Sequence, residues 1–279
     1  MCKKIILLAF LLFQLTIFPA TIIFDLNGVL VYQNKLKVCL NAGLYTLARY
    51  VLTHGPFIKN LFTTTLNAVP YDTNVIEAPE DQDGNALPPI MIGWLKGEID
   101  GNQLVDHVEQ FLASTPECCK TSSKKRFISS LARAVFAPKS FAQATCFYKD
   151  AITLVKSCKA AGHKVYILSN WDKASFEYIQ QWYPEFCELF DGIEISGNID
   201  MIKPQKEIYE YIINKYNLDP TKTAFIDDQR VNIRTAKDCH LFGIQCTQKK
   251  SFISSSPDTQ KIRNKINAWL ASINEIYIN

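Results

Sequence analysis

The second half of the chain alternates short apolar runs with segments of helical periodicity. The short runs are typical of buried strands and cover residues 165–168, 192–196, 224–226 and 241–246. The periodic segments are typical of amphipathic helices and cover residues 151–161, 174–183, 204–216 and 231–239. A further apolar run, residues 21–24, predicts a strand near the start of the chain. This alternation predicts an α/β fold: a parallel, Rossmann-like sheet with helices on both faces.

Residues 34–148 interrupt this alternation. Helices are expected there at residues 36–52, 57–69, 101–113 and 126–136, and residues 74–89, rich in Asp, Asn, Gly and Pro, predict a loop. We therefore expect a mainly helical cap, residues 34–148, inserted into an α/β core formed by residues 21–33 and 149–279. A final helix with an apolar stripe from Ile262 to Ile273 is expected to pack on this core.

The first twenty residues have a different character. Lys3 and Lys4 precede an apolar run over residues 5–18, and Pro19-Ala20 follow it. A basic start, an apolar stretch of this length and a small final residue resemble a secretory signal peptide, residues 1–20. This predicts an exported protein, periplasmic or secreted, with transient membrane contact through the leader. The alternative is a membrane anchor formed by residues 5–18, although that run is short for a span and a strand follows it without a linker.

Charge and cysteine content limit the partners and metal sites that we expect. The chain of 279 residues has a formal charge of +3, and without the two leader lysines 28 basic residues face 27 acidic ones. This balance gives no support for a nucleic-acid partner. The nine cysteines show no spacing typical of a metal site. Export would permit disulfides, and buried free thiols are the alternative, above all for Cys158, Cys239 and Cys246.

Three predicted strands end in side chains that bind phosphate or divalent cations. Asp25 follows the first strand, Ser169 follows residues 165–168, and Asp227 and Asp228 follow residues 224–226. Ligands bind to parallel sheets at the carboxyl ends of the strands. Carboxylates that meet there repel one another unless a cation lies between them, and Mg²⁺ held by carboxylates and a substrate phosphate is the usual arrangement. Asp25 can then also act as a nucleophile that forms an acyl phosphate.

Two further polar residues extend this group. Lys203 lies at an expected helix start, where N–H groups favour anions, and its ammonium is expected to neutralise the nucleophile and the phosphoryl group. The Ser169 hydroxyl and the N–H groups after it are expected to hold phosphate oxygens. Asn232 is expected to orient Asp228 from the first turn of the next helix. Taken singly, each of these residues has an ordinary alternative as a cap, turn or surface residue.

Four segments resemble, in order, the four motifs of the haloacid dehalogenase (HAD) superfamily. They are Phe24-Asp25-Leu26-Asn27-Gly28, Leu168-Ser169-Asn170, Ile202-Lys203-Pro204 and Phe225-Ile226-Asp227-Asp228. The chain is most similar to the subgroup that includes sugar-phosphate phosphatases and the N-terminal domain of soluble epoxide hydrolases, and Gly97-Glu98-Ile99 resembles part of that subgroup's helical cap. The resemblance implies a Mg²⁺-dependent hydrolase of phosphoric monoesters that acts on a small phosphorylated metabolite.

The resemblance also implies a role for each motif residue. The catalytic residues would be Asp25, the nucleophile, and Lys203. The substrate contacts would be Ser169, Asn170 and Asn27. The Mg²⁺ ligands would be Asp25, Asp228, the backbone carbonyl of Asn27 and, as a ligand or support, Asp227.

One position departs from the family pattern. Phosphatases of the family usually carry a second Asp two residues after the nucleophile, and this chain has Asn27 there. An amide can neither protonate the leaving group nor activate water, and such help is typically worth about 10²–10⁴-fold in rate. The backbone carbonyl that would bind the metal is unaffected. Asn27 therefore predicts a lowered rate on an otherwise complete site.

Three functions compete at this point. The first is the phosphatase. The second is a dehalogenase, which Ser169-Asn170 also resembles but which needs no metal and leaves the acidic pair unexplained. The third is a catalytically weak or inactive binding module, suggested by Asn27 and by a cap larger than is common in the subgroup, with an unknown protein partner. Specificity residues are expected in the cap, where the candidates are Lys35, Arg49, Trp94, Lys96 and His107.

Overall fold

The computed structural model describes residues 19–45, 58–75, 78–80, 84–115, 121–250, 255–274 and 277–278. Most of the predicted leader and anchor, and Arg49, lie outside the described residues, so the predictions about export stay predictions. Among the described helices, none combines the length and the apolarity that a bilayer-spanning segment needs.

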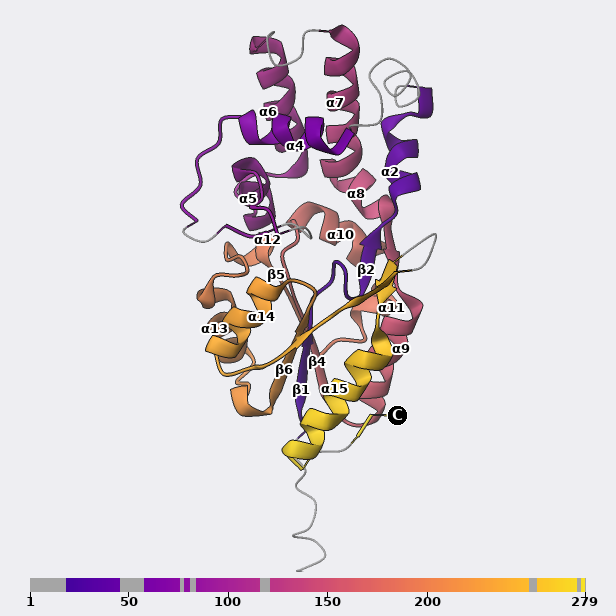
Figure 1. Ribbon diagram of the computed structural model, residues 1–279, viewed down its shortest axis with the longest axis vertical. Helices are drawn as coiled ribbons and strands as arrows, with labels where there is room; N and C mark the ends of the chain where they lie inside the picture. Colours follow the sequence, from indigo (N-terminus) through magenta and orange to yellow (C-terminus); the bar gives the residue numbers. More distant parts are fainter. Residues whose placement is uncertain are drawn as a thin grey trace, which may run out of the picture.

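The core is a sheet of five parallel strands, which confirms the predicted α/β fold (Figure 1). In chain order the strands are β1 (Thr21–Phe24), β4 (Lys164–Ser169), β5 (Gly192–Ile195), β6 (Thr223–Asp227) and β7 (Phe242–Gln245). Their order across the sheet is β5-β4-β1-β6-β7. The first strand of the chain is therefore the central one, and β4 and β6 pair with its two edges.

Alternation along β1 sends side chains to two separate apolar cores. Ile22 and Phe24 belong to the core on one face, which is covered by α9 (Lys149–Ala160), α10 (Lys173–Trp182) and α15 (Thr259–Ser272). Ile23 belongs to the core on the other face, covered by α13 (Lys206–Lys215) and α14 (Arg230–Asp238). All three side chains are buried because a parallel sheet with helices on both faces leaves neither side to solvent. The C-terminal helix α15 packs on α9 and β7, as predicted.

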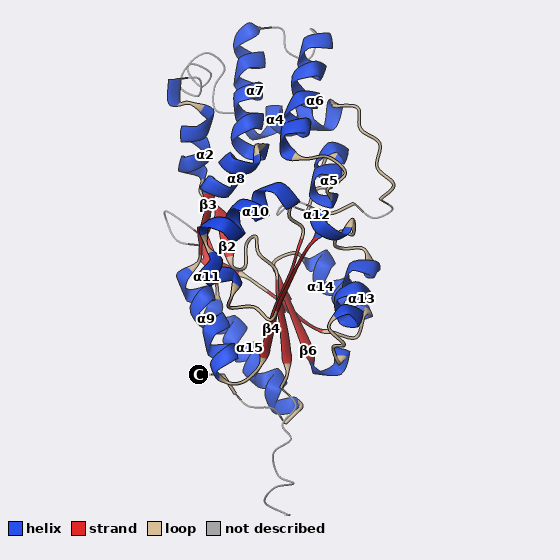
Figure 2. Cartoon of the chain, turned by 180° about the vertical axis from the view of Figure 1, so that it is seen from behind, coloured by secondary structure: helices blue, strands red, loops and turns tan. Residues whose placement is uncertain are grey.

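A group of helices lies beyond the carboxyl ends of the strands (Figures 1 and 2). They are α2 (Lys35–Ala42), α4 (Ile58–Ala68), α5 (Pro89–Lys96), α6 (Gly101–Ser114), α7 (Ser122–Phe136) and α8 (Pro138–Ala144). The apolar faces of α4, α5, α6 and α7 form a third core, around Ile90, Leu104, Val108, Phe127 and Ile128. We refer to these six helices as the cap.

The chain passes between the sheet and the cap through a small antiparallel pair. Its strands are β2 (Val31–Gln33) and β3 (Thr145–Phe147), joined in register from Val31 opposite Phe147 to Gln33 opposite Thr145. Neither strand was predicted, since three residues are too few to show an alternating pattern. Helix α5 was also missed, because Ile90, Ile92, Trp94 and Leu95 are buried around its whole circumference and show no polar face.

The remaining elements connect these layers. They are α11 (Pro184–Cys187), α12 (Ser196–Ile199), the 3₁₀ turn η1 (Pro220–Lys222), and the hairpin strands β8 (Gln248–Lys250) and β9 (Ser255–Pro257). The six cysteines in the described residues are free thiols, and Cys158, Cys239 and Cys246 are buried as the alternative to disulfides predicted.

Candidate active site

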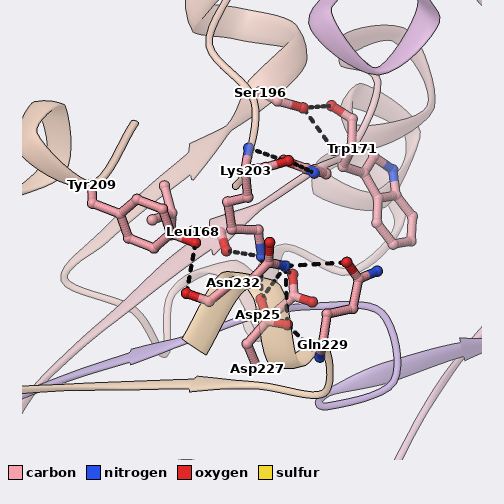
Figure 3. Close-up of polar contacts among 10 residues, drawn as sticks. Asp25, Leu168, Trp171, Ser196, Lys203, Tyr209, Asp227, Gln229 and Asn232 are labelled. Atoms are coloured by element: carbon pink, nitrogen blue, oxygen red, sulfur yellow. Dashed lines mark hydrogen bonds and ion pairs between the residues drawn. The ribbon is translucent and has the colours of Figure 1, made fainter. Parts of the chain in front are cut away.

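Three neighbouring strands end at one point and place their last residues side by side. Asp25 follows β1, Ser169 ends β4, and Asp227 ends β6. Since β1 lies between the other two, Asp25 stands between Ser169 and Asp227. The Asp25 N–H donates to the carbonyl of Ile226 at 2.9 Å, which extends the sheet by one residue and holds the two carboxylates together. The sequence predicted this meeting, and Figure 3 shows Asp25 and Asp227 close together.

Lys203 lies at the centre of the group. Its side chain is 1% exposed, and Nζ contacts Asp25 Oδ1 at 2.9 Å, Asp227 Oδ2 at 2.6 Å and the carbonyl oxygen of Leu168 at 3.0 Å. These contacts account for all three protons of the ammonium group. Burial opposes the charge, but the carboxylates of Asp227 and Asp25 outweigh it and raise the pKa of Lys203 above its usual value. Lys203 is therefore a fixed cation.

The backbone of Lys203 is held by Asn170. The Asn170 Nδ2 donates to the Lys203 carbonyl at 2.9 Å, and the Lys203 N–H donates to Asn170 Oδ1 at 2.8 Å. Asn170, which we predicted to contact substrate, therefore uses its side chain to position Lys203. The expected helix start is also wrong: the Lys203–Pro204 peptide is cis, and α13 begins only at Lys206. Lys203 owes its position to Asn170 and the two carboxylates.

Asp227 is fully buried and accepts hydrogen bonds from several donors. Besides Lys203, the Gln229 N–H reaches Oδ1 at 2.8 Å, and Asn232 Nδ2 reaches Oδ1 at 3.1 Å and Oδ2 at 3.0 Å. The prediction that Asn232 orients Asp228 is thus wrong, because from the first turn of α14 its amide faces Asp227. This arrangement fits the predicted alternative of Asp227 as a support.

Asp228 is half-buried and lies against the loop after β1. A Cβ placed on Gly28 would come within 2.3 Å of Asp228 Oδ2, so the carboxylate occupies the space that a side chain would fill. Gly28 also has φ 78°, in the region that favours glycine. Asn27, next to it, is exposed. Gly28 is a site residue that we quoted within a motif without assigning it a role; its place three residues after a strand-end Asp was the available signal.

The three carboxylates form one acidic cluster. One oxygen from each of Asp25, Asp227 and Asp228 lies within 4.8 Å of the others. Burial, and then the charges of Asp227 and Asp25, raise the pKa of Asp228 to about 8. Three carboxylates exceed the single charge of Lys203, and oxygen donors at this spacing suit a hard divalent cation. The residues present therefore fit Mg²⁺.

The nucleophile candidate and the hydroxyl beside it carry the clearest signs of a reactive site. Burial raises the pKa of Asp25 to about 6, against the opposing effect of Lys203. Ser169 Oγ is buried and makes no hydrogen bond within the described residues, yet it lies close enough to Asp25 to lower that carboxyl's pKa. An unpaired buried hydroxyl is costly unless a ligand completes it. A phosphate oxygen would accept the hydrogen bond that the Ser169 hydroxyl lacks.

The predicted specificity residues lie in different places. Trp94 is buried in the cap core, and Lys96 pairs with Glu98 at 2.8 Å and with Asp200 at 3.1 Å. His107 Nδ1 bonds the carbonyl oxygen of Gln103 within α6, at 2.7 Å, and Lys35 is exposed at the start of α2. Lys96 and His107 are therefore engaged within the protein, Trp94 packs in the cap core, and Lys35 faces solvent.

Residues 19–240 match the family described as haloacid dehalogenase-like hydrolase. The sesquiterpene phosphatase astK of Aspergillus oryzae is 31% identical over 110 residues, which cover 38% of this chain and 56% of that protein. Bifunctional epoxide hydrolase 2 of Rattus norvegicus is 24% identical over 154 residues, which cover 54% of this chain and 27% of that protein. The match thus spans about half of the first relative and about a quarter of the second.

Solved structures share the fold over most of the chain. The HAD family enzyme bt-2542 of Bacteroides thetaiotaomicron, in complex with magnesium and inorganic phosphate, superposes with a TM-score of 0.53 at 17% identity. That superposition covers 84% of this chain and 97% of the other. A dehalogenase superposes with a TM-score of 0.50 at 14% identity, over 88% of this chain and 91% of its own. At these identities the likeness shows the fold.

Proposed function

The chain belongs to the haloacid dehalogenase-like hydrolases, and we propose that it is a Mg²⁺-dependent phosphatase whose nucleophile is Asp25. The observation that carries the proposal is the unpaired, buried Ser169 hydroxyl beside a carboxylate that Lys203 holds in place. A phosphoryl group seated there would meet a donor, a nucleophile and a fixed positive charge at once. The phosphate bound by the bacterial neighbour and the phosphatase among the relatives support the same class of substrate.

The chemistry follows from which oxygens are free. Lys203 holds Asp25 Oδ1, which leaves Oδ2 to attack phosphorus and form an acyl phosphate as the bond to the leaving oxygen breaks and that oxygen takes the electron pair. Ser169 Oγ donates to a phosphoryl oxygen. Water then attacks the phosphorus as the bond between phosphorus and the Asp25 oxygen breaks. The electron pair returns to the Asp25 carboxylate, and the water's protons leave with inorganic phosphate or pass to solvent. Asp25 must be ionised to attack; the Lys203 ammonium favours that form, and bound Mg²⁺ would favour it further.

The metal would be held by Asp25, Asp228 and the backbone carbonyl of Asn27, with Asp227 behind them. When bound, Mg²⁺ would offset the negative charge of the carboxylates and the phosphoryl group. Without a metal, the single positive charge of Lys203 can neutralise only one of the three carboxylates.

Asn27 shapes the expected substrate range. With no acid at this position, the leaving oxygen departs without a proton from the protein, so esters of acidic alcohols such as 4-nitrophenol should react fastest. Small sugar phosphates are the natural class to test first. Sesquiterpenyl phosphates join the panel because a relative is a sesquiterpene phosphatase.

The test is release of phosphate by the purified protein from 4-nitrophenyl phosphate, sugar phosphates and a sesquiterpenyl phosphate, with Mg²⁺ or EDTA. Asp25→Asn should lower turnover at least roughly 10³-fold, the scale on which loss of a covalent nucleophile acts. Asp106→Asn, which changes an exposed carboxylate on α6, is the matched control and should leave turnover unchanged. Turnover that survives Asp25→Asn would contradict the mechanism.

The second candidate, a non-catalytic binding module, draws on the exposed amide of Asn27. In that case the wild-type protein would bind Mg²⁺ and phosphate, measured by calorimetry, without hydrolysing any ester in the panel.

A further inference from the structure

The cap meets the core at several places. Helix α8 packs on α10, and the chain passes between cap and core through the β2–β3 pair. A further contact is formed by α5 and α12, on the opposite side of the molecule from β2 and β3 in both views (Figures 1 and 2). We call this α5–α12 contact the seam and define it as residues 95–97 of the cap with residues 196–202 of the core. Neither the family motifs nor the proposed chemistry assigns it a role.

Ser196 joins three segments at the seam. Its side chain is fully buried, and Oγ donates to the carbonyl of Leu95 in the cap at 2.5 Å. The same oxygen accepts from the N–H of Trp171 at 3.0 Å (Figure 3). Trp171 lies two residues after Ser169. One hydroxyl therefore ties the cap to the loop that carries the predicted phosphate donor.

Other contacts bring the same segments close. A Cβ on Gly97, which has φ 84°, would come within 2.5 Å of the Gly197 carbonyl oxygen, so the two backbones touch without an intervening side chain. Lys96, whose side chain is 13% exposed, pairs with Asp200 at 3.1 Å. Cap and core are therefore joined by backbone contact and charge as well as by the Ser196 hydroxyl.

The core half of the seam runs directly to Lys203. Ile202, the residue before it, is fully buried and belongs to the apolar core of the cap. A cap that moved away from α12 would have to pull Ile202 out of this core or shift it, and Lys203 with it. The seam thus connects the position of the cap to both Ser169 and Lys203.

We propose that Ser196 is a positioning residue that couples the seating of the cap to the placement of Ser169 and Lys203. The proposal rests on the proposed phosphatase function for its effect on rate, while the coupling itself is a property of the fold. With the hydroxyl present, the cap is bonded to the Ser169 loop and Lys203 is set against its two carboxylates.

Ser196→Ala removes the hydroxyl, and Ser196→Thr keeps it. For 4-nitrophenyl phosphate with Mg²⁺, Ser196→Ala should lower kcat on the order of 10-fold with KM changed less than about 3-fold, because displaced groups affect the transition state more than binding. Ser196→Thr should recover most of kcat. Glu210→Gln breaks an exposed ion pair with Lys206, away from the seam, and should leave both constants unchanged.

Amide hydrogen exchange separates coupling from a local effect. The Trp171 N–H loses its acceptor in Ser196→Ala and must exchange faster in any case. The Lys203 N–H bonds to Asn170 and does not touch Ser196, so its exchange reports the coupling and should speed up at least roughly 3-fold. An unchanged Lys203 amide, with a faster Trp171 amide, would overturn the proposal.

Two safeguards keep the test decisive. If Ser196→Ala does not fold, Asp200→Asn breaks the seam's ion pair at a residue whose side chain is 75% exposed, and the Lys203 amide should again exchange faster than in Glu210→Gln. Equal exchange in those two variants would then overturn the coupling. A wild-type protein without phosphatase activity would refute the proposed function alone, since hydrogen exchange still decides the coupling.

Discussion

Replacing Lys203 with Met tests the electrostatic centre of the site. The change removes the cation that contacts Asp25 at 2.9 Å and Asp227 at 2.6 Å, while Met fills most of the same volume. Lys203 is 1% exposed, so water cannot take over its role. Removing one partner of a buried ion pair typically costs about 3–5 kcal/mol, because the remaining charge is left uncompensated. We expect a loss of that size in the free energy of unfolding at pH 7.5.

The loss should depend on pH in a defined direction. With Lys203 present, the pKa of Asp25 in the folded protein is about 6, above its ordinary value of 3.8. Protonated Asp25 therefore stabilises the folded state relative to the unfolded state below about pH 4, and this contribution is lost as the pH rises through about 6. Without Lys203 the pKa of Asp25 rises further, so at pH 5 this carboxyl is neutral and needs no cation. The cost of Lys203→Met should thus be smaller at pH 5 than at pH 7.5.

Urea unfolding in EDTA at both pH values measures these costs. Lys206→Met is the matched control: it removes a lysine three positions away whose pair with Glu210 is exposed to solvent and should contribute little to stability. A cost for Lys203→Met below about 1 kcal/mol at pH 7.5, or one equal at both pH values, would refute the account of a buried, shared cation.

Three further changes test other parts of the protein. Gly28→Ala places a methyl group 2.3 Å from Asp228 Oδ2 and should weaken Mg²⁺ binding about 10-fold or more, measured by titration calorimetry. Asn27→Asp restores a general acid and should raise kcat for alkyl phosphates by about 10²-fold or more, with a smaller gain for 4-nitrophenyl phosphate. Asp172→Asn removes a buried carboxyl whose pKa burial raises to about 6. Since the wild type loses stability between about pH 4 and 6 as this group ionises, the variant should gain relative to it by up to roughly 3 kcal/mol over that interval, measured by urea unfolding.

Each of these changes has a control or a contrary outcome. Gly162→Ala has the same kind of positive φ but open space around its Cβ, so it should leave Mg²⁺ affinity intact. An equal gain for alkyl and aryl esters in Asn27→Asp would show that leaving-group protonation is not the limiting deficiency. If Asp172→Asn and the wild type keep a constant difference in stability from pH 4 to pH 7, Asp172 is ionised throughout.

The fold was predictable because its strands and helices repeat a simple pattern. The strands β1, β4 and β6 are short and apolar because both faces of a parallel sheet are covered. The polar residue at or just after the end of each strand, Asp25, Ser169 or Asp227, marks the edge of the sheet. That edge could be inferred without knowing the strand order, because all parallel strands share it. The convergence of Asp25, Ser169 and Asp227 follows from the same rule.

The partners within the site were less predictable. Whether the Asn232 amide faces Asp227 or Asp228 depends on the angle at which α14 leaves β6. The two aspartates are neighbours in the sequence, so the spacing to Asn232 does not reveal which of them it contacts. The clamp of Asn170 on Lys203 joins two loops that lie 33 residues apart in the chain, and neither residue alone predicts the other as its partner. The Leu168 carbonyl and the Gln229 N–H are backbone groups, which every residue has, so no sequence signal distinguishes them.

The central place of β1 has a consequence for synthesis on the ribosome. This strand leaves the exit tunnel before the other four strands of the sheet, and both of its neighbours, β4 and β6, follow only after the whole cap has been made. Until then its two edges have no native partner and are open to wrong pairing, a hazard that molecular chaperones counter. Most of the apolar core of α4, α5, α6 and α7 is made before β4, so these helices can gather earlier. The acidic cluster can therefore form only after residues 223–228 have been made and β6 pairs with the open edge of β1.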